Sequence, residues 1–120
     1  MANQNAKGLK RLINACLFSA SGFKATWQHE EAFRQEVIAF FLSTPIALWL
    51  GQSPVEKVLL IGSVVLVMLV ELLNSAVEAV VDRVGYEHHE LSGRAKDIGS
   101  AAVTLAITWA ALTWLLILIR

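Results

Sequence analysis

Five polar residues interrupt an apolar stretch of this chain, and their types and spacing suit chemistry inside or beside a membrane. They recur at i, i+3, i+4, i+7 and i+11, which places them on one face of one helix: Glu71, Asn74, Ser75, Glu78 and Asp82. A carboxylate costs roughly 2.5–3.5 kcal/mol at the centre of a bilayer, so apolar residues would pack there at lower cost. Hydrogen bonding between helices accounts equally well for Asn74 and Ser75, but not for both glutamates. We interpret Glu71 as a general base in poorly solvated surroundings.

A second pair of acids, Glu30 and Glu31, stands just before an apolar run that begins at Val37. We expect them at a depth similar to that of Glu78, at the membrane interface. Proteins usually hold Mg²⁺ with one or two carboxylates together with phosphates and water. The alternative is a pair of solvated acids favoured by a helix dipole. The pattern therefore indicates a possible Mg²⁺ site between Glu30 and Glu78.

Basic and imidazole side chains come later, in the polar segment before the last apolar run. Lys96 stands at the expected start of a helix, where the dipole disfavours a cation unless an anion is near. Helix N-termini favour phosphate, and a lysine adds a point charge for it. Flanking charge that orients a membrane helix is the alternative reading of Lys96. His88 and His89 would either hydrogen-bond phosphates or lie in a solvated loop.

The composition indicates the class of protein in which these groups are positioned. The 120 residues are 56% hydrophobic and 17% charged, and ten basic residues balance ten acidic ones. A soluble domain carries about 25% charge, so we expect a small membrane protein. The zero net charge excludes a general nucleic-acid binder, and the single cysteine excludes a disulfide framework or a cysteine-built zinc site.

The fold expected from these patterns is an all-α membrane protein made of one domain, residues 1–120. Apolar runs predict membrane helices at about 31–50, 55–83 and 94–119, with a tight turn at 51–54 and a polar connection at 84–93. Pro45 should kink the first of these helices. Residues 7–27 are too polar to span, and their apolar residues recur at helical spacing. They predict an amphipathic helix on the membrane surface, although packing on a partner is an alternative.

Basic residues set the orientation. Eight lie before the first span or in the 83–97 connection, against two on the other side, Lys57 and Arg120. By the positive-inside rule, the N-terminus and residues 83–97 are cytoplasmic in a multi-pass protein of the cytoplasmic membrane.

Three segments resemble the prokaryotic integral-membrane diacylglycerol kinase family. They are EEAFRQE at residues 30–36, VELLNSAVEAVVDRVG at 70–85, and HELSGRAKDIGSAA at 89–102. The resemblance covers nearly the whole chain. It implies ATP-dependent phosphorylation of 1,2-diacylglycerol to phosphatidic acid with Mg²⁺. It also implies a homotrimer in the bacterial inner membrane, with three spans and one surface helix in each chain.

The resemblance also implies roles for individual residues. Glu71 serves as the catalytic base, supported by Asn74 and Asp82, and Glu30 and Glu78 bind the metal carried by ATP. The implied ATP contacts are Arg11, Phe18, Glu30, Glu78, Glu87, His88, His89, Lys96 and Asp97. The implied lipid-substrate contacts are Arg11, Lys24, Ala25, Thr26, Trp27, Ala32, Phe33, Arg34, Gln35, Glu36, Trp49, Lys57, Glu71, Ser100 and Trp114.

The chain departs from the usual family pattern at a few positions. Phe18 stands where many members have tyrosine, and Ala20 and Ser21 replace a bulky aromatic and a basic residue. Pro45 is not a recognised family feature.

Other functions remain open from sequence. An undecaprenol kinase of the same family would look similar, and only the lipid groove would differ. A small proton-coupled transporter would place its acid at mid-bilayer, and an assembly factor would leave the aligned polar residues unexplained. Because three thin spans cannot surround a lipid, a metal and a triphosphate, we expect each site to draw on two chains. A neighbour's surface helix with Glu30 would close a site opened by Glu71.

Overall fold

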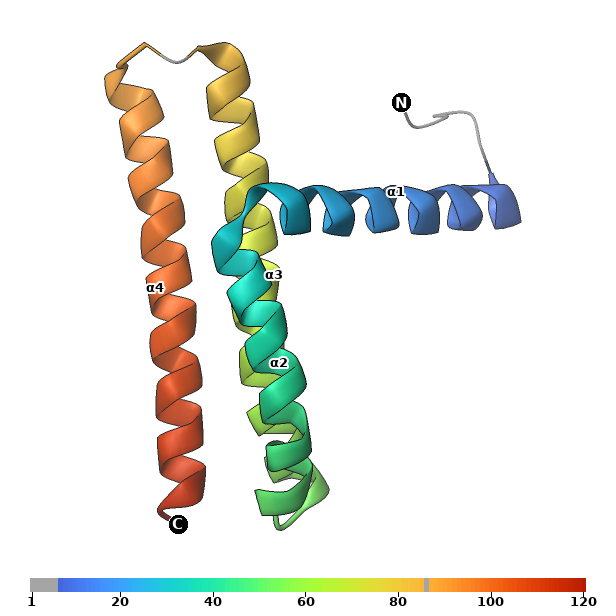
Figure 1. The fold of residues 1–120 in the computed structure, drawn as a ribbon, viewed down its shortest axis with the longest axis vertical. Coiled ribbons are helices and arrows are strands. Elements are labelled where there is room, and N and C mark those ends of the chain that lie inside the picture. Colours follow the sequence, from blue (N-terminus) through green and yellow to red (C-terminus); the bar gives the residue numbers. More distant parts are fainter. Residues whose placement is uncertain (1–6, 86) are drawn as a thin grey trace.

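The computed structural model describes residues 7–85 and 87–120, which form helices joined by short connections (Figure 1). In chain order these are α1 (Gly8–His29), α2 (Glu31–Leu50), α3 (Pro54–Val84) and α4 (Glu90–Leu118). Residues 1–6 and 86, which the expected domain includes, lie outside the described residues. The described chain is therefore all-helical, as expected, with α2, α3 and α4 running alongside one another.

The helix ends differ from the expected ones by a few residues, and local hydrogen bonds explain why. Helix α4 begins at Glu90 rather than at 94, because Nδ1 of His89 accepts the Leu91 N–H at 3.0 Å and caps the helix. Helix α1 continues past 27 to His29, and the Glu30 N–H still donates to the Thr26 carbonyl at 2.9 Å. Helix α3 starts with Pro54 at its first position, after Ser53 accepts the Glu56 N–H at 3.2 Å.

Helix α3 is the centre of the bundle, because it contacts each of the other three helices. It supplies the buried side chains Leu60, Ser63, Val67 and Glu71, whereas α2 and α4 contribute few buried side chains. Most large apolar side chains of α2, α3 and α4 are exposed. A single chain with so little core and so much exposed apolar surface suits a lipid or partner-chain environment.

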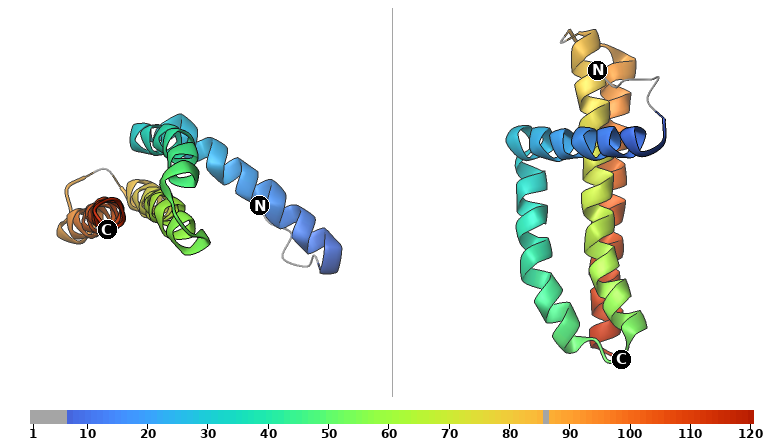
Figure 2. Two further views of the ribbon diagram at one scale, coloured as in Figure 1. Left: turned by 90° about the horizontal axis from the view of Figure 1, so that it is seen from below. Right: turned by 90° about the vertical axis from the view of Figure 1, so that its right-hand side faces the viewer.

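Two helices in the described part of the chain, α3 and α4, are long and apolar enough to cross a membrane. Helix α2 is shorter, at 20 residues, and carries Glu31, Arg34 and Glu36 in its first two turns. Pro45 lies inside α2, which stays one helix and curves gently in Figure 2. The expectation of three spans therefore rests on α2 as a marginal third.

Helix α1 leaves the bundle and runs crosswise to the other helices (Figures 1 and 2). No residue of α1 is buried, and Leu9, Leu12 and Leu17 are among its exposed apolar side chains. A single residue, Glu30, joins it to α2. Arg34 fixes the corner, because its Nη1 donates to the Trp27 carbonyl at 2.6 Å and to the Gln28 carbonyl at 3.3 Å. A helix held crosswise with an exposed apolar side is the geometry of a surface helix.

The opposite end of the bundle is closed by polar contacts between helices. Arg120 pairs with Glu56 at 2.9 Å and donates to the Leu50 carbonyl at 3.1 Å. Six residues before Arg120, Nε1 of Trp114 on α4 donates to the Leu60 carbonyl of α3 at 3.1 Å. These bonds tie the ends of α2, α3 and α4 together.

Candidate active site

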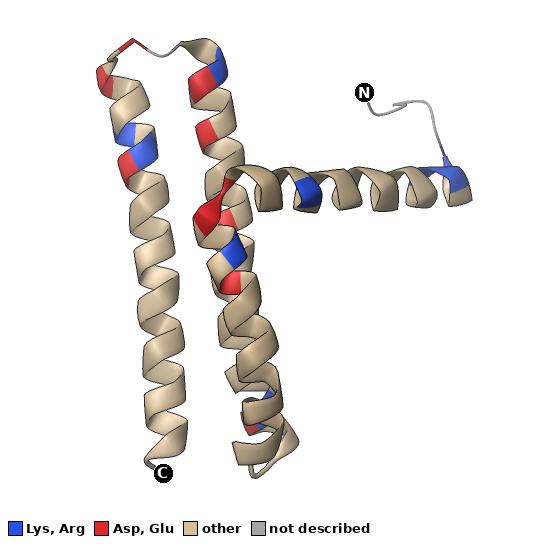
Figure 3. Ribbon diagram, in the orientation of Figure 1, with Lys and Arg blue, Asp and Glu red and all other residues tan. Residues whose placement is uncertain are grey.

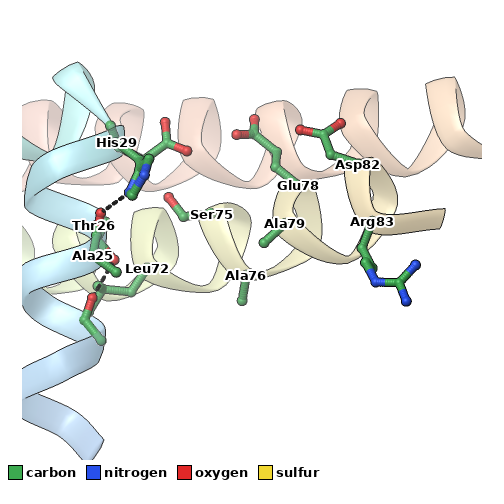
Figure 4. A pocket seen from close by; sticks show the side chains of 12 residues that line it. Ala25, Thr26, His29, Leu72, Ser75, Ala76, Glu78, Ala79, Asp82 and Arg83 are labelled. Atoms are coloured by element: carbon green, nitrogen blue, oxygen red, sulfur yellow. Dashed lines mark hydrogen bonds between the residues drawn. The ribbon is translucent and has the colours of Figure 1, made fainter. Parts of the chain in front are cut away.

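Acidic residues lie near the start of α4, along the C-terminal half of α3 and at the joint between α1 and α2 (Figure 3). A cavity of about 760 Å³ opens there, between the end of α1 and the C-terminal half of α3. Its polar lining includes Thr26, His29, Glu30, Glu78 and Asp82. In Figure 4, Glu78 and Asp82 point to the same side of α3, whereas Arg83 points away from them. The cavity thus presents several acids to one space.

Glu30 and Glu78 form an acidic pair at the site. The two carboxyls lie close enough to interact directly. Burial raises the pKa of Glu30 above its usual range, and the negative charges of Glu78 and Glu71 raise it further. Two facing carboxylates repel each other unless a proton or a cation lies between them, so this pair fits a divalent cation.

Further protein ligands do not complete a metal shell at this pair. Among residues 7–85 and 87–120, no group of three or more His, Cys, Asp or Glu side chains is placed to hold a metal ion. A site with two carboxylates that leaves its other positions to phosphates and water is the arrangement usual for Mg²⁺. The donor set therefore fits an ion that arrives with a nucleotide.

Glu71 lies deeper, with 4% of its surface exposed, on the face of α3 that packs beside α2. Seven residues separate it from Glu78, which is about 10 Å along the helix. The carboxyl of Glu36 on α2 lies close enough to Glu71 for the two charges to repel. Glu36 Oε1 is buried and has no hydrogen-bond partner among the described residues. A buried acid, Glu71, and a half-buried one, Glu36, thus lie close together outside the lining of the cavity.

Asn74 connects the acids to α4. Its Nδ2 donates to Oε1 of Glu78 at 3.4 Å, a long bond that orients the Glu78 carboxylate. Its carboxamide oxygen lies against Gly99 of α4, where a Cβ would overlap it. The Asn74 side chain is therefore held between the acid on its own helix and the backbone of its neighbour.

A smaller cavity of about 160 Å³ lies between the end of α3 and the start of α4. Its lining contains several of the expected nucleotide contacts, namely Glu87, His88, His89 and Lys96. Nζ of Lys96 pairs with Oδ1 of Asp82 at 2.9 Å across the two helices. Asp82 lines both cavities, so it lies between the acidic site and the basic one.

Some expected contacts lie elsewhere in this chain. Arg11 and Phe18 are exposed on α1 and precede Gly22, the first α1 residue that lines the large cavity. Asp97 is exposed on α4, next to Lys96 but outside the lining of both cavities. A single chain therefore does not bring Arg11 or Phe18 to the acids.

The expected lipid contacts fall into groups. Ala25 and Thr26 line the large cavity, and Glu36 lies beside Glu71. Phe33 is buried, with 3% of its surface exposed, in the packing beneath the joint. The others are exposed on α1 or the start of α2, lie on α4, or lie toward the far end of the bundle: Lys24, Trp27, Ala32, Gln35, Trp49, Lys57, Ser100 and Trp114.

The expectation that a neighbouring chain supplies Glu30 stays a prediction, but a neighbour is not needed to bring a Glu30 to the acids of α3. Glu30 lies beside Glu78 and within electrostatic reach of Glu71 of the same chain. The reason is the sharp turn at Glu30 between α1 and α2, which folds the end of α1 back against α3. One chain can thus bring the three acids near one another by itself.

Sequence reasoning did not find two of the residues that shape the site. Glu36 was grouped with lipid contacts, although it follows the buried Phe33 by three residues and so shares its helix face. That spacing was the available signal. Gly99 carried no signal of its own, because nothing in the sequence pairs it with Asn74.

Comparison with known proteins gives a consistent answer. Residues 17–118 match a family model described as prokaryotic diacylglycerol kinase. The chain is 57% identical over 118 residues to a diacylglycerol kinase of Escherichia coli K12, covering 98% of this chain and 96% of the relative. It is 50% identical over 107 residues to that of Haemophilus influenzae, covering 89% and 91%, respectively. With that of Pseudomonas aeruginosa the identity is 48% over 112 residues, covering 93% and 91%.

Proposed function

Since the chain belongs to the prokaryotic diacylglycerol kinase family and phosphorylates diacylglycerol, we propose that the acids around Glu30 carry out this transfer. The substrates are ATP and a lipid alcohol, and the products are ADP and phosphatidic acid. The observation that supports the proposal most strongly is the position of a buried acid, Glu71, about two helical turns from the Glu30–Glu78 pair.

Glu71 is the general base of the proposed mechanism. It accepts the proton of the diacylglycerol hydroxyl as that oxygen attacks the γ-phosphorus of ATP and the bond to ADP breaks. Phosphoryl transfer depends mainly on positioning and on neutralising charge, so one base and a well-held phosphate suffice. Burial of Glu71 keeps water away from the proton that it removes. Asn74 orients the neighbouring Glu78 carboxylate.

Glu30 and Glu78 would hold the Mg²⁺ that accompanies ATP. When bound, the ion supplies positive charge that neutralises the phosphate oxygens. Lys96 would contact the phosphates from the other side, together with the neighbouring Asp97 and with Glu87, His88 and His89. Both cavities border on Asp82, so one extended nucleotide can occupy them together.

The lipid would approach from the membrane side. We assign its glycerol to the region between Ala25 and Thr26, which line the large cavity, and the neighbouring acids Glu36 and Glu71. The remaining lipid contacts proposed on α1, on the start of α2, and at Trp49, Lys57, Ser100 and Trp114 would border the acyl chains.

The proposed setting is the bacterial inner membrane, with α1 on the cytoplasmic leaflet and α2, α3 and α4 as three spans. The excess of basic residues at the N-terminus and at 83–97 supports a cytoplasmic N-terminus. The exposed apolar surface of the bundle supports a homotrimer, in which partner chains cover part of that surface.

A direct assay tests the proposed substrate. Purified protein in mixed micelles should transfer the γ-phosphate of ATP to 1,2-diacylglycerol in the presence of Mg²⁺. Undecaprenol in the same micelles is the comparison lipid, and micelles without a lipid alcohol are the blank. Faster phosphorylation of undecaprenol than of diacylglycerol would overturn the lipid assignment.

A further inference from the structure

The ion pair between Lys96 and Asp82 stands at the boundary between the two cavities. Its 2.9 Å contact joins the start of α4 to the end of α3. The Lys96 side chain is 47% exposed and that of Asp82 is 38% exposed. Neither group has lost its water, so the pair can be broken at low cost.

The charges around the pair are unequal. Asp82, Glu78 and Glu30 all line the large cavity. Arg83 borders it too, but its guanidinium points away from Glu78 and Asp82 in Figure 4. Lys96 therefore partly neutralises the acidic side of the site while it is paired with Asp82.

We infer that Asp82 holds Lys96 in the nucleotide-free protein and that the phosphates of ATP displace Asp82, so that Lys96 changes partner when the nucleotide binds. This inference rests on the proposed contact between Lys96 and the nucleotide. Asp82 is then a positioning residue: it keeps the ammonium at the edge of the cavity and competes with the phosphates for it. The phosphates win this competition because together they carry more negative charge than the single Asp82 carboxylate.

The size of the effect follows from the exposure of the pair. Exposed ion pairs of this kind change an equilibrium by about two- to fivefold. Replacing Asp82 by asparagine removes the competing charge while keeping the size of the side chain. Asp82→Asn should therefore lower the dissociation constant and the KM for Mg·ATP about two- to fivefold.

A double-mutant cycle with Lys96 identifies the route of the effect. Four full-length proteins in lipid nanodiscs are compared for equilibrium binding of Mg·ATP: wild type, Asp82→Asn, Lys96→Gln and the double variant. Lys96→Gln alone should weaken binding, and Asp82→Asn should no longer tighten it in that background. Glu90→Gln is the matched control, because it breaks the exposed Glu90–Arg94 pair at 3.5 Å on the same helix and should change neither constant.

The outcomes separate the inference from the proposed function. Unchanged binding of Mg·ATP in Lys96→Gln would contradict the proposed contact between Lys96 and the nucleotide. A second outcome is weaker binding in Lys96→Gln together with the same effect of Asp82→Asn in the wild type and in Lys96→Gln. Asp82 would then simply repel the phosphates, and the exchange of partners would be overturned. Weaker binding in Asp82→Asn alone would overturn it as well, because the pair would then be a structural tie between α3 and α4.

A measurement on unmutated protein avoids any folding defect. Reductive ¹³C-methylation keeps the lysine charge, and the Lys96 signal is assigned by its loss in Lys96→Gln. The signal should move when Mg·ATP is added, as the ammonium leaves a carboxylate for phosphates. A signal that does not move at saturating nucleotide would contradict the inference.

Discussion

Gly99 of α4 lies directly against the carboxamide of Asn74 on α3. A Cβ added at Gly99 would overlap the Asn74 carboxamide oxygen and stand 3.0 Å from its Cγ. The same side chain donates to Glu78 at 3.4 Å, so α4 packing and the orientation of a site carboxylate depend on one contact. Glycine at position 99 is thus required by the close approach of the two helices rather than by backbone torsion.

The first prediction follows from that contact. Gly99→Ala should destabilise the protein by about 1–3 kcal/mol, because an overpacked contact forces a side chain or a helix to shift. It should also reduce turnover, since Asn74 must rotate away from Glu78. Gly62→Ala is the matched control, because nothing lies within 4 Å of a Cβ there. Thermal unfolding and turnover measured in the same detergent check both effects, and equal behaviour of the two variants would contradict the argument.

The second prediction concerns the base. Glu71→Gln keeps the size of a side chain that is only 4% exposed, and it removes the proton acceptor. Turnover should fall by about 10²-fold or more, the usual contribution of a general base. Binding of Mg·ATP should persist, since Glu71 does not hold the metal. Near-normal turnover would remove Glu71 from this role.

The third prediction concerns the facing carboxylates. Glu30→Gln and Glu78→Gln should each raise the KM for Mg·ATP, because each removes one oxygen ligand and part of the charge that attracts Mg²⁺. Mn²⁺ should partly restore activity. Glu31→Gln is the matched control, as Glu31 is the exposed neighbour of Glu30 on the helix start. The metal assignment fails if the Mg·ATP dependence of all three variants is the same.

The fourth prediction concerns assembly. Glu30 and Glu71 lie within electrostatic reach of each other in one chain. If the two also act together in one site, mixed trimers of Glu30→Gln and Glu71→Gln chains should stay inactive. Arg11 does not reach the acids of its own chain, so a neighbour would supply it. Each mixed trimer of Glu71→Gln and Arg11→Gln chains should then contain one intact site of three, and so recover about a third of the activity in a symmetric assembly.

Subunit mixing must be verified by affinity purification through a tag on only one kind of chain. Trimers reconstituted separately and then combined are the control for free exchange. Recovery of activity in the mixture of Glu30→Gln and Glu71→Gln chains would show that Glu30 of one chain acts with Glu71 of a neighbouring chain.

The fifth prediction concerns topology. In a Cys16→Ala background, a membrane-impermeant thiol reagent should label Gln52→Cys from the periplasmic side and Ser92→Cys only from the cytoplasmic side. The basis is the uneven distribution of basic residues. Labelling of Gln52→Cys only from the cytoplasm would reverse the proposed orientation.

The helices themselves could be predicted from sequence to within a few residues, because apolar runs and turn residues carry that information locally. The one larger difference, the start of α4, arose because a histidine cap is a weak signal in a polar loop. The role of α1 as a crosswise helix also followed from its own pattern of apolar and charged residues.

The polar face of α3 shows where local information ends. One face was correctly expected to hold Glu71 and Glu78, but its members meet different neighbours in the structure. Asn74 meets Gly99 of α4, Asp82 meets Lys96, and Glu71 lies beside Glu36 of α2. These partners are distant in sequence. Helix periodicity shows which residues share a face, but it does not predict how two helices are rotated against each other. For the same reason, Arg120 could not be paired with Glu56 in advance.

The crosswise position of α1 has a consequence for bilayers of different thickness. The end of α1 and α3 residues from Leu72 to Asp82 line one cavity, so the surface helix sets the height of the acids. When α1 rests in the headgroup region, Glu71 stays at a constant distance below that plane. A thicker or thinner membrane then creates hydrophobic mismatch at the opposite end, around the 51–54 turn and the Arg120–Glu56 pair. In the proposed membrane setting, the surface helix therefore fixes the depth of the reacting groups relative to the cytoplasmic leaflet.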